Sequence, residues 1–149
     1  MQIINYFTSN NKEHWLNEIS KSDWSAGQFL HHLLKENKLC ELVGEGARVL
    51  ILVEGDELIS FCTLAKMDDI QPTDLTPWIG FIYTFPAHRG ERLAGKLLSH
   101  AEKLAKDDGA SNVYISTNHV GLYEKYGYNF LRTMKDVEGE DSRVYTKSL

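Results

Sequence analysis

The residues best suited to chemistry lie in one segment, which runs from Trp78 to Leu98 with the sequence WIGFIYTFPAHRGERLAGKLL. An apolar run typical of a strand ends near Pro86, and a short basic turn leads into an amphipathic helix that we predict to begin near Glu91. The first backbone N–H groups of a helix have no partner within the helix, and they attract anions. The segment is therefore a candidate anion-binding site.

The composition of the turn favours a pyrophosphate as the anion. Gly90 and Gly95 let a ligand approach the backbone closely, while Arg89, Arg92 and Lys96 supply positive charge. The turn lacks the final Ser or Thr of the Walker pattern GxxxxGK[ST], and it lacks the dinucleotide pattern GxGxxG. A solvated helix start that binds no ligand is the alternative interpretation.

Length and composition indicate one globular domain over residues 1–149. The chain is 42% hydrophobic and 25% charged, and its net charge is −5 with no run of lysines or arginines. We expect no nucleic-acid partner, because binding to a phosphate backbone needs a basic surface. The N-terminus lacks the pattern of a signal peptide, and no apolar run approaches the ~20 residues that span a bilayer. We therefore expect a cytoplasmic protein with no membrane partner.

Cysteine and histidine spacing indicates neither a disulfide nor a metal site. Cys40 and Cys62 form no CxxC pair, and the six histidines form no cluster of ligands. Cys62 lies in a predicted strand, and no GxSxG or other nucleophile pattern is present. We expect reduced cysteines, no metal and no acyl-enzyme intermediate.

Hydrophobic periodicity predicts the elements that position the anion site. Strands are predicted at 3–7, 47–53, 58–65, from 78, 112–116, 128–135 and 143–146, and helices from about 10, from 25, over 91–109 and over 119–126. Asn10 and Ser25 are predicted to cap the first two helices, and Gly80 predicts a bulge or a close approach within its strand. The order β-α-α-β-β-β-α-β-α-β-β predicts an α/β (α+β) fold, with one mixed, mainly antiparallel sheet and helices on both faces.

The segment from Trp78 to Leu98 resembles the acetyl-CoA-binding motif of the GNAT superfamily of N-acetyltransferases. In that motif an apolar strand ends near a proline, and [QR]-x-x-G-x-[GA] leads into a helix. Arg89 and Ala94 match the first and last positions, and Arg92 stands where a glycine is usual. Downstream, NHVGLYEKYGYNF resembles the family's asparagine-to-LYxxxGF segment. These two motifs and the order of the elements make the chain similar to GNAT proteins over nearly its whole length.

The resemblance implies that acetyl-CoA is the co-substrate, and it implies roles for matching residues. Backbone groups around Ile82, Tyr83 and Thr84 would meet the pantetheine arm and the acetyl carbonyl. The pyrophosphate would lie against the turn, which comprises Arg89, Gly90, Glu91, Arg92, Leu93, Ala94 and Gly95. Asn118 matches the position that usually hydrogen-bonds the cofactor arm.

Tyr123 matches the tyrosine that often protonates the leaving thiolate in this family. A phenol with a pKa near ~10 is a suitable donor to a thiolate. A packed aromatic with no catalytic role is the alternative for Tyr123, and Tyr126 is a second candidate donor.

The base that deprotonates the amine is predicted among Asp68, Asp69 and Asp74, which precede the strand from Trp78. A water chain, or a solvated acidic loop with no catalytic role, is the alternative. If these aspartates line the site, their charge favours a cationic amine. Trp78 either shapes an acceptor pocket or lies buried at the start of its strand.

The predicted function is direct transfer of an acetyl group from acetyl-CoA to a primary amine of a small molecule or protein. The alternative is a non-catalytic acyl-CoA-binding or sensor module of the same fold. Arg92 favours the module, whereas Asn118 and Tyr123 favour the enzyme. Domains of this family commonly dimerise, so a homodimer is one expected assembly.

Overall fold

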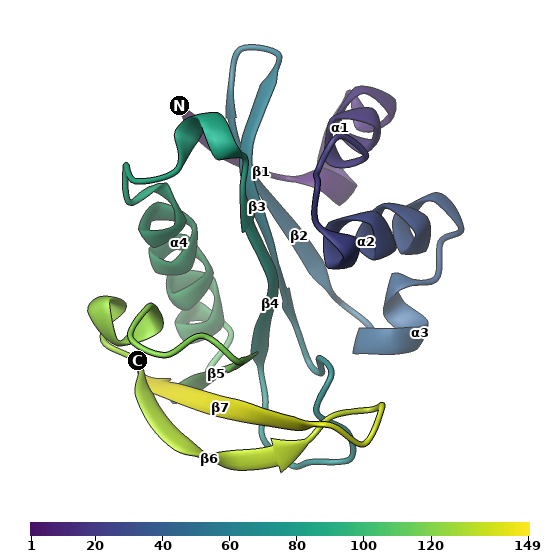
Figure 1. The fold of residues 1–149 in the computed structure, drawn as a ribbon. Coiled ribbons are helices and arrows are strands. Elements are labelled where there is room, and N and C mark those ends of the chain that lie inside the picture. Colours follow the sequence, from purple (N-terminus) through teal and green to yellow (C-terminus); the bar gives the residue numbers. More distant parts are fainter.

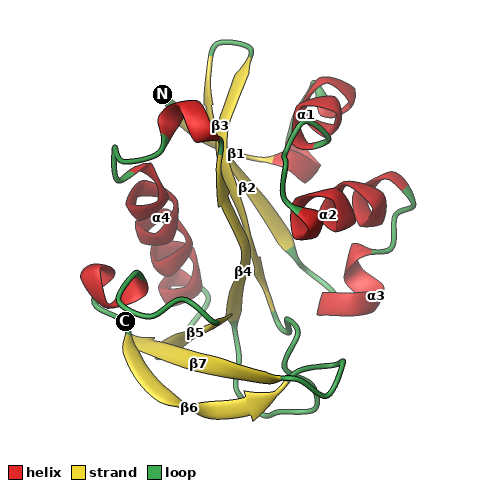
Figure 2. Cartoon of the chain, viewed as in Figure 1, coloured by secondary structure: helices red, strands yellow, loops and turns green.

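A computed structural model describes residues 1–149 (Figures 1 and 2). Seven strands form one sheet in the order β1-β2-β3-β4-β5-β7-β6. The strands are β1 Gln2–Asn5, β2 Arg48–Glu54, β3 Glu57–Ala65, β4 Trp78–Thr84, β5 Asn112–Thr117, β6 Asn129–Lys135 and β7 Asp141–Ser148. The helices are α1 Lys12–Ile19, α2 Ser25–Lys35, α3 Leu39–Val43 and α4 Leu93–Asp107. Short 3-10 turns follow at Tyr6–Thr8, Pro86–His88 and Tyr123–Tyr126. All strand pairs except β4–β5 are antiparallel, which confirms the predicted fold class.

The sheet buries one hydrophobic core on each face. Helices α1, α2 and α3 cover one face, and α4 covers the other (Figure 1). Alternation along β2 divides its side chains between the two cores, with Val49 and Ile51 facing the first and Leu50 and Leu52 the second. The apolar run over 47–53 is therefore the signature of a strand buried on both faces.

Strands β4 and β5 pair in parallel and then separate. Their register is defined by one pair, Trp78 and Tyr114, beyond which the two strands diverge. On the β3 side, two residues of β4, Phe81 and Ile82, oppose the single residue Cys62, and Phe81 has a positive φ of 49°. This is a bulge one residue beyond Gly80, close to where the sequence predicted one.

Several local predictions were wrong. The first strand ends at Asn5 because Tyr6–Thr8 forms a 3-10 turn, and α3 was not predicted because five residues are too few to show a period. The predicted helix over 119–126 is only the 3-10 turn Tyr123–Tyr126.

The two predicted helix caps are also wrong. Asn11, not Asn10, precedes α1, and Ser25 is the first residue of α2 rather than its cap. The side chain of Gln28 donates to the carbonyls of Ser20 and Ser22 instead of closing a capping box. None of the helices is long and apolar enough to cross a membrane.

Candidate active site

Two cavities of opposite charge meet beside the separated ends of β4 and β5. The basic cavity, of about 680 Å³, is lined by Arg89, Arg92 and Lys125, with Asp23 as its only acidic residue. The acidic cavity, of about 450 Å³, is lined by four carboxylic acids and by no lysine or arginine. These acids are Asp68, Asp69, Asp136 and Glu138. Trp24, Ile82, His119 and Tyr123 line both cavities and form their common wall.

The turn after β4 wraps one side of the basic cavity because two of its residues have a left-handed backbone conformation. Gly90 has a φ of 85° and open space where a side chain would stand. Arg92 has a φ of 57° and immediately precedes Leu93, so α4 begins two residues later than predicted. Glycine adopts this conformation at no steric cost, whereas another residue there costs about 1 kcal/mol. A left-handed backbone is therefore a physical reason for a glycine at position 92, and Arg92 bears a strain that glycine would not.

Most of the predicted cofactor residues line the basic cavity, and three do not. The lining residues are Ile82, Tyr83, Thr84, Arg89, Gly90, Arg92, Leu93 and Ala94. Glu91, Gly95 and Asn118 lie outside both cavities. Gly95 has a separate reason to lack a side chain, because a Cβ there would lie 2.8 Å from the ring of Tyr126. The cofactor roles of all these residues stay predictions.

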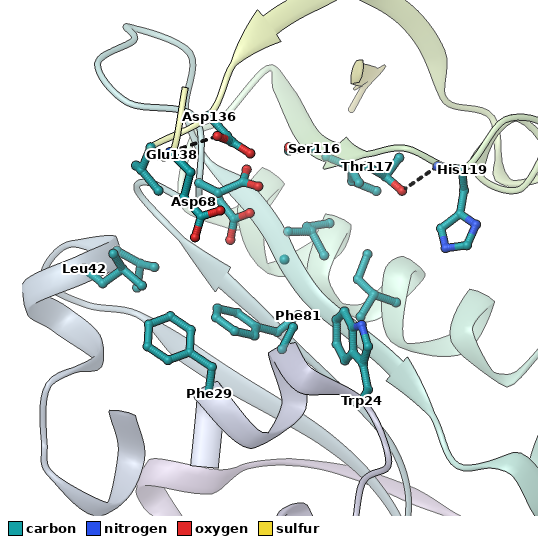
Figure 3. A pocket seen from close by; sticks show the side chains of 18 of the residues that line it. Trp24, Phe29, Leu42, Asp68, Phe81, Ser116, Thr117, His119, Asp136 and Glu138 are labelled. Carbon is teal, nitrogen blue, oxygen red and sulfur yellow. Dashed lines mark hydrogen bonds between the residues drawn. The ribbon is translucent and has the colours of Figure 1, made fainter. Parts of the chain in front are cut away.

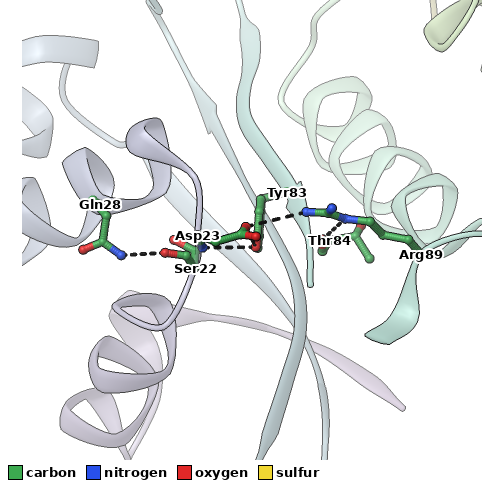
Figure 4. Close-up of polar contacts among 6 residues, drawn as sticks. All are labelled: Ser22, Asp23, Gln28, Tyr83, Thr84 and Arg89. Carbon is green, nitrogen blue, oxygen red and sulfur yellow. Dashed lines mark hydrogen bonds and ion pairs between the residues drawn. The ribbon is translucent and has the colours of Figure 1, made fainter. Parts of the chain in front are cut away.

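Arg89 is held by a network that joins the turn to the loop between α1 and α2 (Figure 4). Its Nε donates to the carbonyl of Thr84 at 2.9 Å, and its guanidinium lies 3.9 Å from the carboxylate of Asp23. The hydroxyl of Tyr83 donates to the same carboxylate at 2.5 Å. The ring of Tyr83 stacks on Trp24 with 5.7 Å between centroids. The network therefore fixes Trp24, part of the common wall, relative to the basic turn.

Tyr123 stands where the two cavities meet. The residue is only 6% exposed, although it lines both cavities. Burial is the main cause that raises the pKa of Tyr123 above its usual value, and the nearby Cys62 and Tyr126 contribute less. The phenol is therefore protonated and available as a donor. Tyr126 lines only the basic cavity and packs on Gly95 of α4.

The acidic cavity has carboxylates on one side and aromatic rings on the other (Figure 3). Asp136 and Glu138 come from the turn between β6 and β7, and Asp68 comes from the loop after β3. Phe29 of α2 and Phe81 of β4 lie opposite them. Such a cavity suits a molecule that is both cationic and partly apolar.

Asp68 and Asp69 are coupled acids with raised pKa values. Burial, and then the charge of Asp69, raises the pKa of Asp68 to about 7. Burial also raises the pKa of Asp69, although the Ser116 hydroxyl opposes this effect. Asp68 lies against the backbone of β4, where a Cβ at Gly80 would be 2.1 Å from its Oδ1. Gly80 thus provides the close approach that the sequence predicted, and a carboxyl that titrates near neutral pH is suited to accept a proton.

The remaining candidates lie away from the cavities or in the core. Asp74 is exposed and lines neither cavity, and Trp78 is fully buried with its indole N–H donating to the carbonyl of Leu75. Cys62 is fully buried, and burial raises the pKa of its thiol to about 12, so it does not supply a thiolate. No group of three or more His, Cys, Asp or Glu side chains is arranged to hold a metal.

Sequence reasoning missed the contribution of the β6–β7 turn. Nothing in the sequence between the predicted strands 128–135 and 143–146 indicates the distant loop of Asp69. In the fold, the backbone N–H of Val137 donates to the carbonyl of Asp69 at 2.8 Å. Sequence reasoning likewise assigned no role in the site to Trp24, which lines both cavities.

The sequence model of the acetyltransferase (GNAT) family matches residues 12–128 of this chain. Among curated proteins, none matches it significantly. Among solved structures, it resembles an aminoglycoside 6'-N-acetyltransferase from Enterococcus faecium, with a TM-score of 0.70, 14% identity, and 99% and 97% of the two chains covered. A GNAT family acetyltransferase from Elizabethkingia anophelis with acetyl-CoA bound gives a TM-score of 0.68, 16% identity and 99% and 97% coverage. An acetyltransferase from Streptococcus agalactiae gives 0.67, 20% identity and 99% and 98% coverage. At these identities the structures establish a shared fold.

Proposed function

The chain belongs to the acetyltransferase (GNAT) family, and on that premise we propose that it transfers an acetyl group from acetyl-CoA directly to a primary amine. The observation that carries this proposal is the junction of a basic cavity and an acidic cavity at Tyr123. One cavity suits a phosphorylated donor and the other suits a cationic acceptor. The reacting atoms would meet at their common wall.

The basic cavity would hold acetyl-CoA. Arg89, Arg92 and Lys125 would face its phosphates, and backbone groups of β4 near Ile82 would meet the pantetheine arm where β4 and β5 separate. The likeness to a structure with acetyl-CoA bound supports this assignment.

The acidic cavity would hold the amine, and Asp68 would act as its base. An amine attacks a thioester only after its ammonium form has lost a proton, and a carboxyl that titrates near 7 can accept that proton. The nitrogen lone pair then forms the new C–N bond while the C–S bond breaks, and the second proton that the nitrogen loses balances the one that Tyr123 gives to the thiolate. The likeness to an aminoglycoside 6'-N-acetyltransferase supports an acceptor that is a small molecule with amino groups.

Tyr123 would donate a proton to the departing thiolate. The burial that raises its pKa makes the phenol a weaker acid than in water. The transfer is feasible because the thiolate would leave into the same buried surroundings, which raise the pKa of its conjugate thiol as well.

The proposal predicts different effects for two tyrosines of one turn. Tyr123→Phe should lower kcat by about a hundredfold, the scale of general-acid catalysis, and leave acetyl-CoA affinity nearly unchanged. Tyr126→Phe is the matched control, because Tyr126 lines the basic cavity and not the acidic one. Thiol release over a panel of amines gives kcat, and calorimetry gives the affinity. An unaffected rate in Tyr123→Phe removes this residue from the acid role.

A binding module is the second candidate function, and Arg92 is the observation that favours it. The module would bind CoA in calorimetry but release no thiol with any amine of the panel. An enzyme would do both, and the absence of both CoA binding and thiol release would contradict both functions.

A further inference from the structure

We propose that Asp136 and Glu138 anchor a second ammonium group of the acceptor, which is therefore a compact diamine with an apolar linker. This inference rests on the proposed acetyl transfer to an amine. It assigns a specificity role to the turn between β6 and β7 and divides the acidic cavity into two subsites.

The negative charge of the acidic cavity is not neutralised within the protein. None of its four acids takes part in any of the chain's ion pairs, and no lysine or arginine lines the cavity. In addition, Oδ1 of Asp69 is buried and has no hydrogen-bond partner. Leaving such an atom unpaired is unfavourable, so its environment favours a ligand that donates hydrogen bonds.

The two pairs of acids are suited to two separate ammonium groups. Asp68 lies against Gly80 of β4, where the reacting amine would stand, and Asp69 lies next to Asp68 and near Ser116 of β5. Asp136 and Glu138 lie on a different turn and face the same cavity (Figure 3). A monoamine could pair with only one of these sets of acids, whereas a diamine could pair with both.

The turn that carries the second pair is preorganised. Oδ1 of Asp136 accepts from the backbone N–H groups of Glu138 and Glu140, each at 2.9 Å. The backbone N–H of Asp136 donates to the carbonyl of Glu140, and the backbone N–H of Val137 donates to the backbone carbonyl of Asp69. The second oxygen of Asp136 and the whole carboxylate of Glu138 stay free for a ligand. Little conformational entropy would be lost on binding.

The aromatic side of the cavity suits the linker. Phe29 is 47% exposed although it is a large apolar residue of a packed helix. Its ring lies 6.4 Å from that of Phe81, and both line the cavity. A methylene chain lying against these rings would cover apolar surface that water now contacts. A volume of about 450 Å³ limits the acceptor to a small molecule.

The test compares cadaverine with n-pentylamine, which has the same carbon chain and only one amino group. We expect cadaverine to have a KM about tenfold lower, as one charge-assisted contact would give. The double variant Asp136→Asn, Glu138→Gln should raise the KM of cadaverine about tenfold more than it raises that of n-pentylamine. Asparagine keeps the oxygen that orders the turn. Glu140→Gln is the matched control, since Glu140 lies on the same turn but outside the cavity.

Equal KM values for the two amines, or a double variant that loses nothing with cadaverine, would overturn the inference while acetyl transfer stands. If neither amine is acetylated, calorimetry with the CoA-loaded protein provides the same comparison. If the unmodified protein binds cadaverine and only the double variant does not, the anchoring site is supported even though the proposed reaction fails. Equal or undetectable binding of both amines overturns it.

Discussion

Substituting Gly80 by alanine tests the placement of Asp68 without touching a charged group. Gly80 does not have a positive φ, so an alanine at this position adds no backbone strain. Its Cβ would lie 2.1 Å from Oδ1 and 2.7 Å from Cγ of Asp68. Carbon and oxygen atoms in contact are normally about 3.3 Å apart. The carboxyl group must therefore move by roughly 1 Å.

A displacement of this size has a predictable effect on rate. A misplacement of about 1 Å costs on the order of a hundredfold when a reacting group must be held in line. We therefore expect kcat/KM for the amine to fall about a hundredfold in Gly80→Ala. Acetyl-CoA affinity should change little, because Gly80 lines the acidic cavity and not the basic one.

The assay is a double-mutant cycle on thiol release, with calorimetry for acetyl-CoA affinity. In the Asp68→Ala background the colliding carboxylate is absent, so Gly80→Ala should have almost no further effect. The coupling energy should then be about 2.7 kcal/mol, which is a hundredfold in rate. Equal losses in both backgrounds, or an unchanged rate in Gly80→Ala alone, would refute the role of Asp68 as base.

Three further predictions concern Asp68, Arg92 in the turn after β4, and Asp23, whose carboxylate lies beside Arg89. Because burial raises the pKa of Asp68 from its usual value of 3.8 to about 7, the folded state between these pH values holds a proton that the unfolded chain has released. The free energy of unfolding should thus fall as pH rises between these values. Asparagine does not titrate, so Asp68→Asn should be up to about 4 kcal/mol more stable than the unmodified chain at about pH 8, with no such gain at about pH 4. Urea titrations at the two pH values measure this difference. Arg92→Gly should relieve the left-handed strain without loss of stability, and should weaken CoA binding in calorimetry at low salt more than at high salt. Asp23→Asn should tighten CoA binding several-fold by freeing Arg89 for phosphate, whereas weaker binding would show that the network preorganises Arg89.

Most of the lining of the basic cavity was predictable because it is contiguous in sequence. A strand, a glycine-containing turn and a helix start follow one another from Trp78 to Leu98, and local pattern determines how they lie relative to each other. The β2–β3 hairpin was predictable for the same reason. The same local rules placed the start of α4 near Glu91, but the left-handed backbone of Arg92 delays it to Leu93.

The acidic half was not predictable because its parts are far apart in the chain. Phe29, Asp69, Ser116 and Glu138 come from four segments that only the complete sheet brings together. Charge alone could identify Asp68 and Asp69 as candidates, and it identified Asp74 equally well. Only the fold separates them, since Asp74 stays exposed on the far part of the same loop.

The bulge in β4 explains how one strand serves both cavities. In a regular strand, residues two apart face the same side of the sheet. Here Ile79 packs in the core under α4, whereas Phe81 and Tyr83 pack against the core under α1–α3, so the alternation changes phase between Gly80 and Phe81. Without the extra residue, Phe81 and Tyr83 would face α4, and neither the aromatic side of the acidic cavity nor the stacking on Trp24 would form. The positive φ of Phe81, which costs about 1–2 kcal/mol, is therefore coupled to the construction of the site, and Gly80 was its only sign in the sequence.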